Sequence, residues 1–227
     1  MNTQLINMDD AVPHHISPQT FLSTPLSDEQ LYEVLENAQF SSSNHNTQPW
    51  NVHIVSGNKK DELAKLIITH NLNNLKSSDL SFDHNTCNDY HIRSQEQIRL
   101  YSEILGVVPK REKPRKPKKS YLKNYQFFNA PHAAFLFMPA FGDHLRIASD
   151  IGMYAQSLLL SLTAHGYSGI PQTILKPHAD IIKESLGISD DFQLLFGIAF
   201  GYVSTHGPTS NICMPRLTLE ESITFHH

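Results

Sequence analysis

The loop that decides the fold reads Ser41-Ser42-Ser43-Asn44-His45-Asn46-Thr47-Gln48-Pro49-Trp50. Before it, Ser27 is a good helix N-cap with Gln30 three positions later, and apolar residues follow at helical spacing. After it, the segment from Trp50 to Val55 alternates in polarity, which predicts a strand. The loop is therefore held between a helix and a strand. Its amides and hydroxyls suit a flat heterocycle or a phosphate, and an ordinary Ser/Asn-rich turn is the alternative.

The residues on either side of this loop predict further helices and strands in alternation. Because no linker or repeat divides the chain, we expect one domain over 1–227, with an extended arm at 1–20 that contains Pro13 and Pro18. The alternation indicates an α/β or α+β sandwich. The predicted helices are Lys60 to Ile68, Ile92 to Leu105, Leu145 to His165 and Ala179 to Leu186, and the predicted strands are Ala133 to Met138 and Gln193 to Phe200.

A second polar segment follows the long predicted helix and reads Gly166-Tyr167-Ser168-Gly169-Ile170-Pro171-Gln172-Thr173. Its two glycines permit close approach of the backbone to a ligand. A helix C-cap and turn would need only Gly166 and Pro171. Both interpretations stay open on the residues alone.

Composition narrows the class of protein. The chain has 227 residues, of which 40% are hydrophobic and 18% charged, and a formal net charge of −4. This charge gives no general electrostatic reason to expect a nucleic acid or an anionic membrane as partner. Cys87 and Cys213 are too few for a disulfide framework, and no apolar run approaches a membrane span in length. We therefore expect an unexported, cytoplasmic protein without a membrane partner.

Two local clusters of the sequence are candidates for other chemistry. The segment from Lys110 to Lys119 contains prolines that forbid a regular helix, and its charges repel one another, so we expect a basic mobile loop over 108–120. It lacks interleaved aromatic residues, which disfavours nucleic acid binding. The spacing His84-x-x-Cys87-x-x-x-His91 suits zinc, but a structural zinc takes four protein ligands and no fourth is evident. No metal site is predicted.

Taken together, the polar segments and their order along the chain resemble the nitroreductase-like family of FMN-dependent oxidoreductases. Residues 42–50 are similar to the family's Pro-Ser-x-x-Asn-x-Gln-Pro-Trp segment, with Ser42 where that pattern has proline. Five further segments match in the same order, and such an ordered set is more specific than one match. They are Asn124 to Pro131, Asp150 to Gln156, Gly166 to Gln172, Gly197 to Tyr202, and Asn211 through Arg216 to Glu221.

The resemblance implies an α+β fold, a nitroreductase-like sandwich whose central, mostly antiparallel sheet is flanked by helices. It also implies a homodimer with swapped terminal segments and FMN sites at the interface, each built from both chains. The implied activity is reduction of a small nitro, quinone or related acceptor, with NAD(P)H as electron donor and ping-pong hydride transfer. Because the flavin N5 carries this chemistry, no catalytic side chain is expected.

The resemblance also assigns the residues that would bind the cofactor. The polar loop would come from one subunit, while the turn after the long helix would come from the other and place backbone donors near the flavin N5 edge. The N-terminal arm and a C-terminal arginine would hold the phosphate. The residues so assigned are Ser42, Ser43, Asn44 and Asn46 in the loop, Pro171, Gln172, Thr173 and Ile174 in the turn, and His15, Ser17, Gln19 and Arg216 at the phosphate.

The sequence departs from the family pattern at the phosphate. The family usually has Arg-Arg-Ser-x-Arg before its first helix, and here the corresponding residues are His15-Ile16-Ser17-Pro18-Gln19. Both cationic positions are thus replaced, apart from whatever fraction of His15 is protonated. We expect Arg216 to carry most of the phosphate binding. The alternative is a degenerate flavin-binding protein of the same fold without turnover.

Overall fold

An antiparallel sheet lies at the centre of the computed structural model, which describes residues 6–73, 88–104, 119–205, 212 and 214–227. Within these ranges the sheet has four strands in the order β1-β2-β4-β3, and every neighbouring pair is antiparallel. The strands are β1 (Asn51–Ser56), β2 (His132–Pro139), β3 (Ser168–Gln172) and β4 (Phe192–Gly201).

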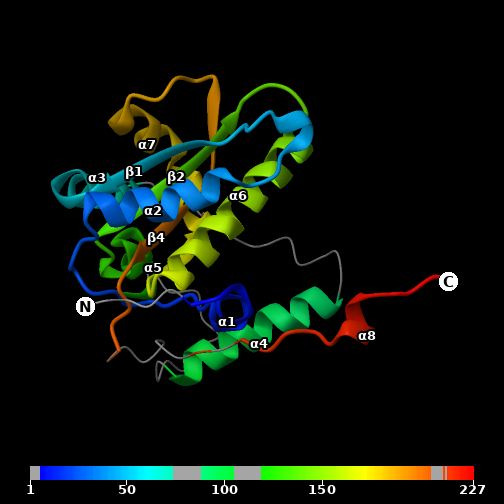
Figure 1. Cartoon of the computed structure of the whole chain (residues 1–227). Helices are drawn as coiled ribbons and strands as arrows, with labels where there is room; N and C mark the ends of the chain where they lie inside the picture. Colours follow the sequence, from blue (N-terminus) through cyan, green and yellow to red (C-terminus); the bar gives the residue numbers. More distant parts are fainter. Residues whose placement is uncertain (1–5, 74–87, 105–118, 206–211, 213) are drawn as a thin grey trace.

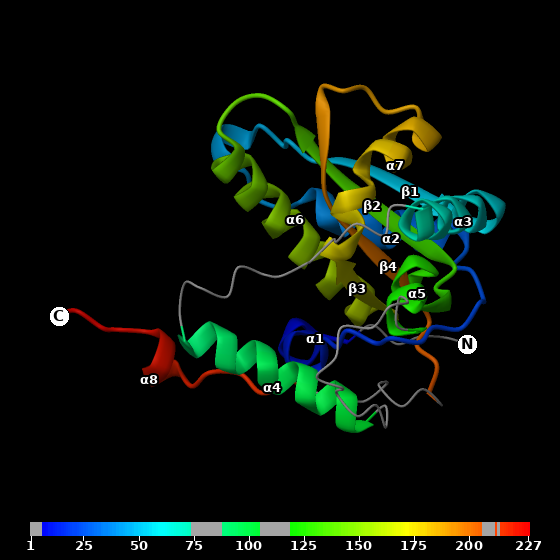
Figure 2. The ribbon, with the colours of Figure 1, turned by 180° about the vertical axis from the view of Figure 1, so that it is seen from behind.

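Helices cover both faces of this sheet, so the protein is an α+β sandwich as predicted (Figures 1 and 2). One face packs against α2 and α6, and the other packs against α3, α5 and α7. The α-helices are α1 (Met8–His14), α2 (Asp28–Gln39), α3 (Gly57–Asn73), α4 (Asn88–Ile104), α5 (Lys119–Tyr125), α6 (His144–Ala164), α7 (Ala179–Leu186) and α8 (Leu219–Ser222). Short 3-10 helices are η1 (Asn44–Asn46), η3 (Phe127–Asn129) and η4 (Thr173–His178).

The position of β2 inside the sheet, covered on both faces, explains why its sequence is apolar throughout instead of alternating between polar and apolar residues. Ala133, Phe135 and Phe137 belong to the core beneath α3 and α7, while Ala134 and Leu136 belong to the core beneath α2 and α6. All five side chains are buried. A strand that is covered on both faces has no solvent-facing positions for polar residues.

Several predicted elements are confirmed with small changes in their bounds. Ser27 and Gln30 form a reciprocal capping box at the start of α2. The long predicted helix is α6, and the apolar segments 133–138 and 193–200 lie within β2 and β4. Residues 108–118 of the predicted basic loop lie outside the described residues, as do His84 and Cys87. The last two residues of that predicted loop are helical, because α5 begins at Lys119.

Two expectations were wrong. The arm at 1–20 is not extended throughout, because Met8–His14 forms α1, which the Asn7 side chain caps by accepting a hydrogen bond from the Asp10 amide at 2.9 Å. Gly166 ends α6 in a turn with φ of 78°, as the C-cap interpretation has it, but the residues after it form a strand, since Ser168–Gln172 pairs with β4. Gly169 serves packing there, because a Cβ on it would lie 2.8 Å from Leu159 Cδ2. A proline within the strand is tolerated because β3 is at the sheet edge.

Among the described helices, none combines the length and the apolar character that crossing a membrane requires.

Candidate functional site

The polar loop after α2 is fixed to α6 at its start. The Asn44 amide donates to both carboxylate oxygens of Asp150, at 3.2 Å each. The Gln48 amide donates to Ser43 Oγ at 3.0 Å, which closes the loop on itself. Three non-glycine residues adopt the left-handed region, with φ of 51° at His45, 55° at Asn46 and 45° at Gln48. This backbone is strained, and such strain persists only where surrounding contacts hold it.

The end of the same loop is fixed by aromatic packing. Trp50 stacks on Tyr154 of α6 with ring centroids 5.0 Å apart, and its Nε1 donates to Gln39 Oε1 at 3.0 Å. Burial raises the pKa of Tyr154 to about 12, so this ring is a neutral packing partner at neutral pH. The side chains of Ser42 and Asn46 remain exposed between the two fixed ends. Asn46 Oδ1 accepts a hydrogen bond from Gln48 Nε2 at 3.1 Å, which leaves its NH2 group and the Ser42 hydroxyl to face a ligand that approaches from solvent.

Three of the four residues expected at the phosphate lie together, at the other end of α6. A groove of about 1320 Å³ is lined by residues 15–17, by α4 and by the C-terminal residues 212–222, including Arg216. In Figures 1 and 2, α4 lies alongside the C-terminal segment, below the sheet. His15, Ser17 and Arg216 are thus brought to one groove, as the resemblance implies.

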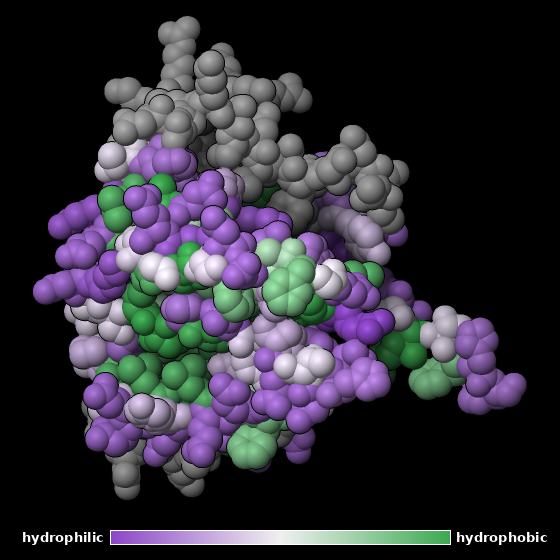
Figure 3. All heavy atoms as spheres, turned by 90° about the horizontal axis from the view of Figure 1, so that it is seen from above, coloured by the Kyte–Doolittle hydropathy of each residue, from purple (hydrophilic) through white to green (hydrophobic). Residues whose placement is uncertain are grey.

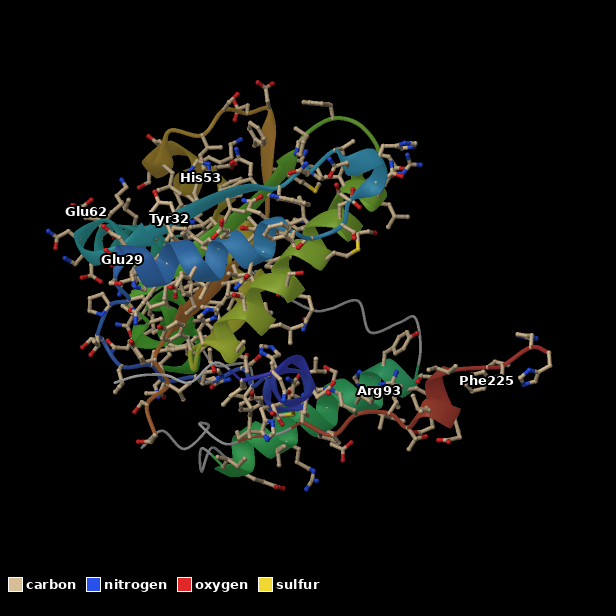
Figure 4. All side chains as sticks on the ribbon, viewed as in Figure 1. Glu29, Tyr32, His53, Glu62, Arg93 and Phe225 are labelled. Atoms are coloured by element: carbon tan, nitrogen blue, oxygen red, sulfur yellow. The ribbon has the colours of Figure 1, made fainter. Side chains whose placement is uncertain are left out.

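The positive charges of this groove come from arginines rather than from histidine, and the carboxylates of Asp89, Glu96 and Glu221 line the same groove. Burial and, secondarily, the nearby Arg216 guanidinium lower the pKa of His15, so that this ring is neutral at neutral pH in the free protein. Its Nδ1 lies 3.4 Å from Thr163 Oγ1 at the end of α6. Arg216 is exposed and donates to the Met214 carbonyl oxygen at 2.8 Å. Helix α4 adds Arg93 to the lining, labelled in Figure 4.

Gln19 lies elsewhere than the sequence alignment suggested. It does not line the groove of Arg216 but a second pocket of about 480 Å³ beside α3 and α5. Three lysines, Lys60, Lys65 and Lys123, line this second pocket. One of them, Lys60, is already engaged by the Ala130 carbonyl oxygen at 2.9 Å and by Asp61 at 3.1 Å. A cation placed at position 19 would therefore join this pocket rather than the groove.

The residues of the third predicted segment, 171–174, differ in their exposure to solvent. Pro171 and Thr173 are exposed and Ile174 is half-buried, so these three can face a ligand. The Gln172 side chain is 2% exposed, and its Nε2 donates to the Asn124 carbonyl oxygen at 2.8 Å. The Gln172 side chain therefore does not face a ligand within this chain, because period-2 alternation in β3 turns it into the core, and only its backbone is left for the expected role as a donor.

The two halves of the predicted site are far apart within one chain. The loop is held at Asp150, and His15 of the groove contacts Thr163 on the same helix α6. A helix rises about 1.5 Å per residue, so the two contacts are about 20 Å apart along the axis. A single flat cofactor cannot use the loop and the groove of the same chain at both of its ends unless it spans that length.

A serine and a histidine that lie close together do not form a hydrolytic pair. His132 Nδ1 lies 2.5 Å from Ser56 Oγ, while its Nε2 accepts the Leu26 amide proton at 2.9 Å. Because a backbone amide only donates, Nε2 is unprotonated and the ring proton sits on Nδ1, facing the hydroxyl. Burial, helped by Lys60, lowers the pKa of His132 to about 4. The ring therefore has no free nitrogen with which to take the Ser56 proton.

Sequence reasoning missed two features of the site. Asp150 was placed in a matching segment but was given no role, and a buried carboxylate on a helix cannot be read from its spacing. Arg93 was not singled out, although Arg93, Gln97 and Leu100 recur at helical spacing and all line the groove. Which face of α4 meets the C-terminal segment depends on tertiary packing.

Comparison with known proteins decides the family. The model of the nitroreductase family matches residues 14–202, which is most of the chain. The chain belongs to the nitroreductase family. Nitroreductase NfnB of Mycolicibacterium smegmatis is 33% identical over 209 residues, covering 91% of this chain and 87% of that protein. A 4-nitrobenzoate reductase of Pseudomonas putida is 28% identical over 218 residues, covering 92% and 91%.

A solved nitroreductase structure has the same fold as this chain. The crystal structure of the FMN-dependent nitroreductase NfnB from Mycobacterium smegmatis in complex with NADPH superposes with a TM-score of 0.88 at 30% identity. The superposition covers 96% of this chain and 97% of the NfnB chain. The nitroreductase family and the sandwich fold that the sequence suggested are both confirmed.

Proposed function

We propose that this nitroreductase is an FMN-dependent NAD(P)H oxidoreductase that reduces a small nitro, quinone or related acceptor. The observation that carries the proposal is the loop at 42–46, which α6 holds in a strained conformation with Ser42 and Asn46 exposed. Relatives named for FMN-dependent and nitrobenzoate-reducing activities support the same chemistry. When bound, FMN supplies hydride acceptance from the nicotinamide and electron delivery to the acceptor.

The donor set of the chain fits FMN. Arg216 offers a guanidinium and Ser17 a hydroxyl in one groove, which is a suitable pair for a phosphate. The exposed side chains of Asn46 and Ser42 carry groups that suit the heteroatoms of an isoalloxazine ring, and the exposed Thr173 follows β3, an edge strand of the described sheet. Asn44 and Ser43 act through the loop backbone, since both are partly buried and hydrogen-bonded.

In this proposal the side chains bind and orient the flavin and the substrate. No side chain takes up or delivers a proton at the substrate. His132 is consistent with this, because it is neutral and both of its ring nitrogens are hydrogen-bonded, to the Leu26 amide and to the Ser56 hydroxyl. The acceptor is left to enter from solvent on the exposed side of the loop. Kinetically, nucleotide and acceptor use the same position in turn, so double-reciprocal plots are expected to be parallel.

We further propose that the enzyme works as a homodimer, with its terminal segments exchanged between subunits. Two observations support this. The loop and the groove lie about 20 Å apart on α6, so a site that uses both is more readily assembled from two chains. The C-terminal segment also exposes apolar side chains for which a second subunit offers cover, with Leu219 at 64% and Phe225 at 73% exposure. Figures 3 and 4 show this segment, with Phe225 labelled in Figure 4, projecting from the body.

We place the enzyme in the cytoplasm, acting on a small molecule without membrane or nucleic acid partners. Its two cysteines and net charge of −4 support that placement. Fractionation of cells that express the tagged chain tests it.

One experiment tests both the activity and the assembly. The purified protein is expected to be yellow, to bleach anaerobically on addition of NADPH, and to regain its colour with a nitroaromatic acceptor. Light scattering should give a dimer. Flavin that stays oxidised would favour the degenerate, non-turning-over alternative, and a monomer that binds FMN stoichiometrically would overturn the shared site.

A further inference from the structure

Asp150 is a buried charge that the reaction does not use. Its side chain is 4% exposed, and no ion pair among the described residues includes it. Within the same residues, its hydrogen bonds are the two that it accepts from the Asn44 amide. Burying a carboxylate without a cation is costly, and an apolar residue would serve the packing of α6 better. The packing of α6 therefore does not account for the buried carboxylate, and its function has to be sought in the segment that it contacts.

The loop that it holds supplies that explanation. Asn44 is the first residue of η1, and the left-handed residues His45 and Asn46 follow directly. Left-handed backbone is unfavourable for non-glycine residues, so the isolated loop would relax to another conformation. The hydrogen bond from Asn44 fixes the point where the strained stretch begins. One turn further along α6, Tyr154 fixes its end through Trp50.

We propose that Asp150 is a positioning residue, whose carboxylate holds the Asn44 amide so that loop 42–46 is in its ligand-presenting conformation before any flavin binds. Preorganisation of this kind removes an ordering cost from the binding step. The consequence for flavin binding rests on the proposed function, whereas the state of the loop in the free protein does not. The carboxylate acts through the loop and touches no reacting atom.

Hydrogen exchange of the flavin-free protein tests the state of the loop. In Asp150→Ala the amides of residues 43–48 are expected to exchange at least about tenfold faster than in the wild type, as for loss of one charge-assisted hydrogen bond. Asp150→Asn should lie between the two, because its amide oxygen still accepts one hydrogen bond. Ser149→Ala is the matched control, since its hydroxyl bonds the Leu145 carbonyl oxygen on the exposed side of the same helix. Unchanged exchange at Asn44, or faster exchange along all of α6, would overturn the proposal.

Flavin titration tests the consequence. Asp150→Ala should weaken FMN and riboflavin by the same factor, about tenfold, because the loop concerns the ring and not the phosphate. Adding His45→Gly should restore part of the affinity, since glycine adopts φ of 51° without steric cost. Ile182→Val, in the core beyond the other face of the sheet, controls for general destabilisation and should leave both affinities unchanged. No rescue by His45→Gly would show that strain is not what Asp150 opposes.

A wild-type protein that binds no flavin would refute the proposed function, and the exchange result would still decide the role of Asp150.

Discussion

The two ends of α6 hold the two halves of the site in different ways. At the loop end, a buried carboxylate and a stacked tyrosine fix the segment 44–50 before any ligand is present. At the groove end, His15 meets Thr163 at 3.4 Å, and Arg216 is exposed and bonded to neighbouring carbonyl oxygens. Under the proposed function, the chain builds the ring-binding half rigidly and leaves the phosphate half to be completed on binding.

The two ends of α6 would therefore recognise different properties of a flavin, the loop end its shape and the groove end its charge. The loop end offers neutral hydrogen bonds in a fixed geometry, which give selectivity for a flat ring at small energy per contact. The groove end offers a guanidinium with a freer geometry, which gives energy through charge. Substitutions at the two ends should therefore be told apart by comparing FMN with riboflavin, which lacks the phosphate.

The largest effect is expected from removing the charge at the groove end. Arg216→Ala should weaken FMN by about ten- to a hundredfold, because a hydrogen bond to a charged group contributes roughly 1.5–3 kcal/mol. Riboflavin affinity should not change. Fluorescence titration of both flavins measures this, and an equal loss for the two would place Arg216 away from the phosphate.

The converse substitutions sharpen the same point. His15→Arg should tighten FMN by about tenfold, since it adds a charge to the groove that Arg216 lines. Gln19→Arg is the matched control, because Gln19 lines the lysine pocket instead. If Gln19→Arg tightens FMN more than His15→Arg does, the separation of the two pockets does not describe the bound state.

A smaller effect is expected at the loop end. Asn46→Gly removes one neutral side chain while φ of 55° remains unstrained, so FMN and riboflavin should both weaken by about two- to tenfold. Asn46→Ala should be worse than glycine, because alanine keeps the backbone strain. A loss confined to FMN would mean that the loop, and not the groove, meets the phosphate.

The smallest effect is the dependence of FMN affinity on pH. Burial and Arg216 lower the pKa of His15 in the free protein, whereas a bound phosphate favours its protonated form. The FMN complex then binds more protons than the free protein does. FMN affinity should therefore rise as pH falls through the pKa of His15 in the complex. It should level off once pH is below the pKa of His15 in the free protein. The change should stay under about tenfold, the equivalent of one pKa unit. Titrations near pH 8 and near pH 6 should show it for wild type and not for His15→Gln.

Much of the fold was predictable because its signals are local. The capping box of Ser27 and Gln30 marks the start of α2, and a long apolar stripe marks α6. The apolar run 133–138 predicts a strand covered on both faces, and β2 is one. These elements depend on nearest neighbours in the sequence or on burial that every residue of the segment shares.

The remainder depends on partners that are remote in sequence. The prolines at 13 and 18 predict an extended arm, yet α1 forms there, and the remote helix α6 packs against it in addition to the local cap from Asn7. The Gln172 side chain turns into the core because β3 pairs with β4, a partner about 25 residues later in the chain. The segment 15–19 was read as one phosphate-binding unit, and only the packing of α3 and α5 beside it reveals that Gln19 faces another pocket.

The helical geometry of α6 sets a limit for engineering. Each residue of a helix adds about 1.5 Å of length but about 100° of rotation. Deleting a single residue between Asp150 and Thr163 would hardly shorten α6, yet it would swing one of its two contacts to another side of the helix. Grafting a loop from a relative with a different acceptor range is therefore feasible at either end of α6. A graft whose junction falls inside residues 150–163 has to preserve their number.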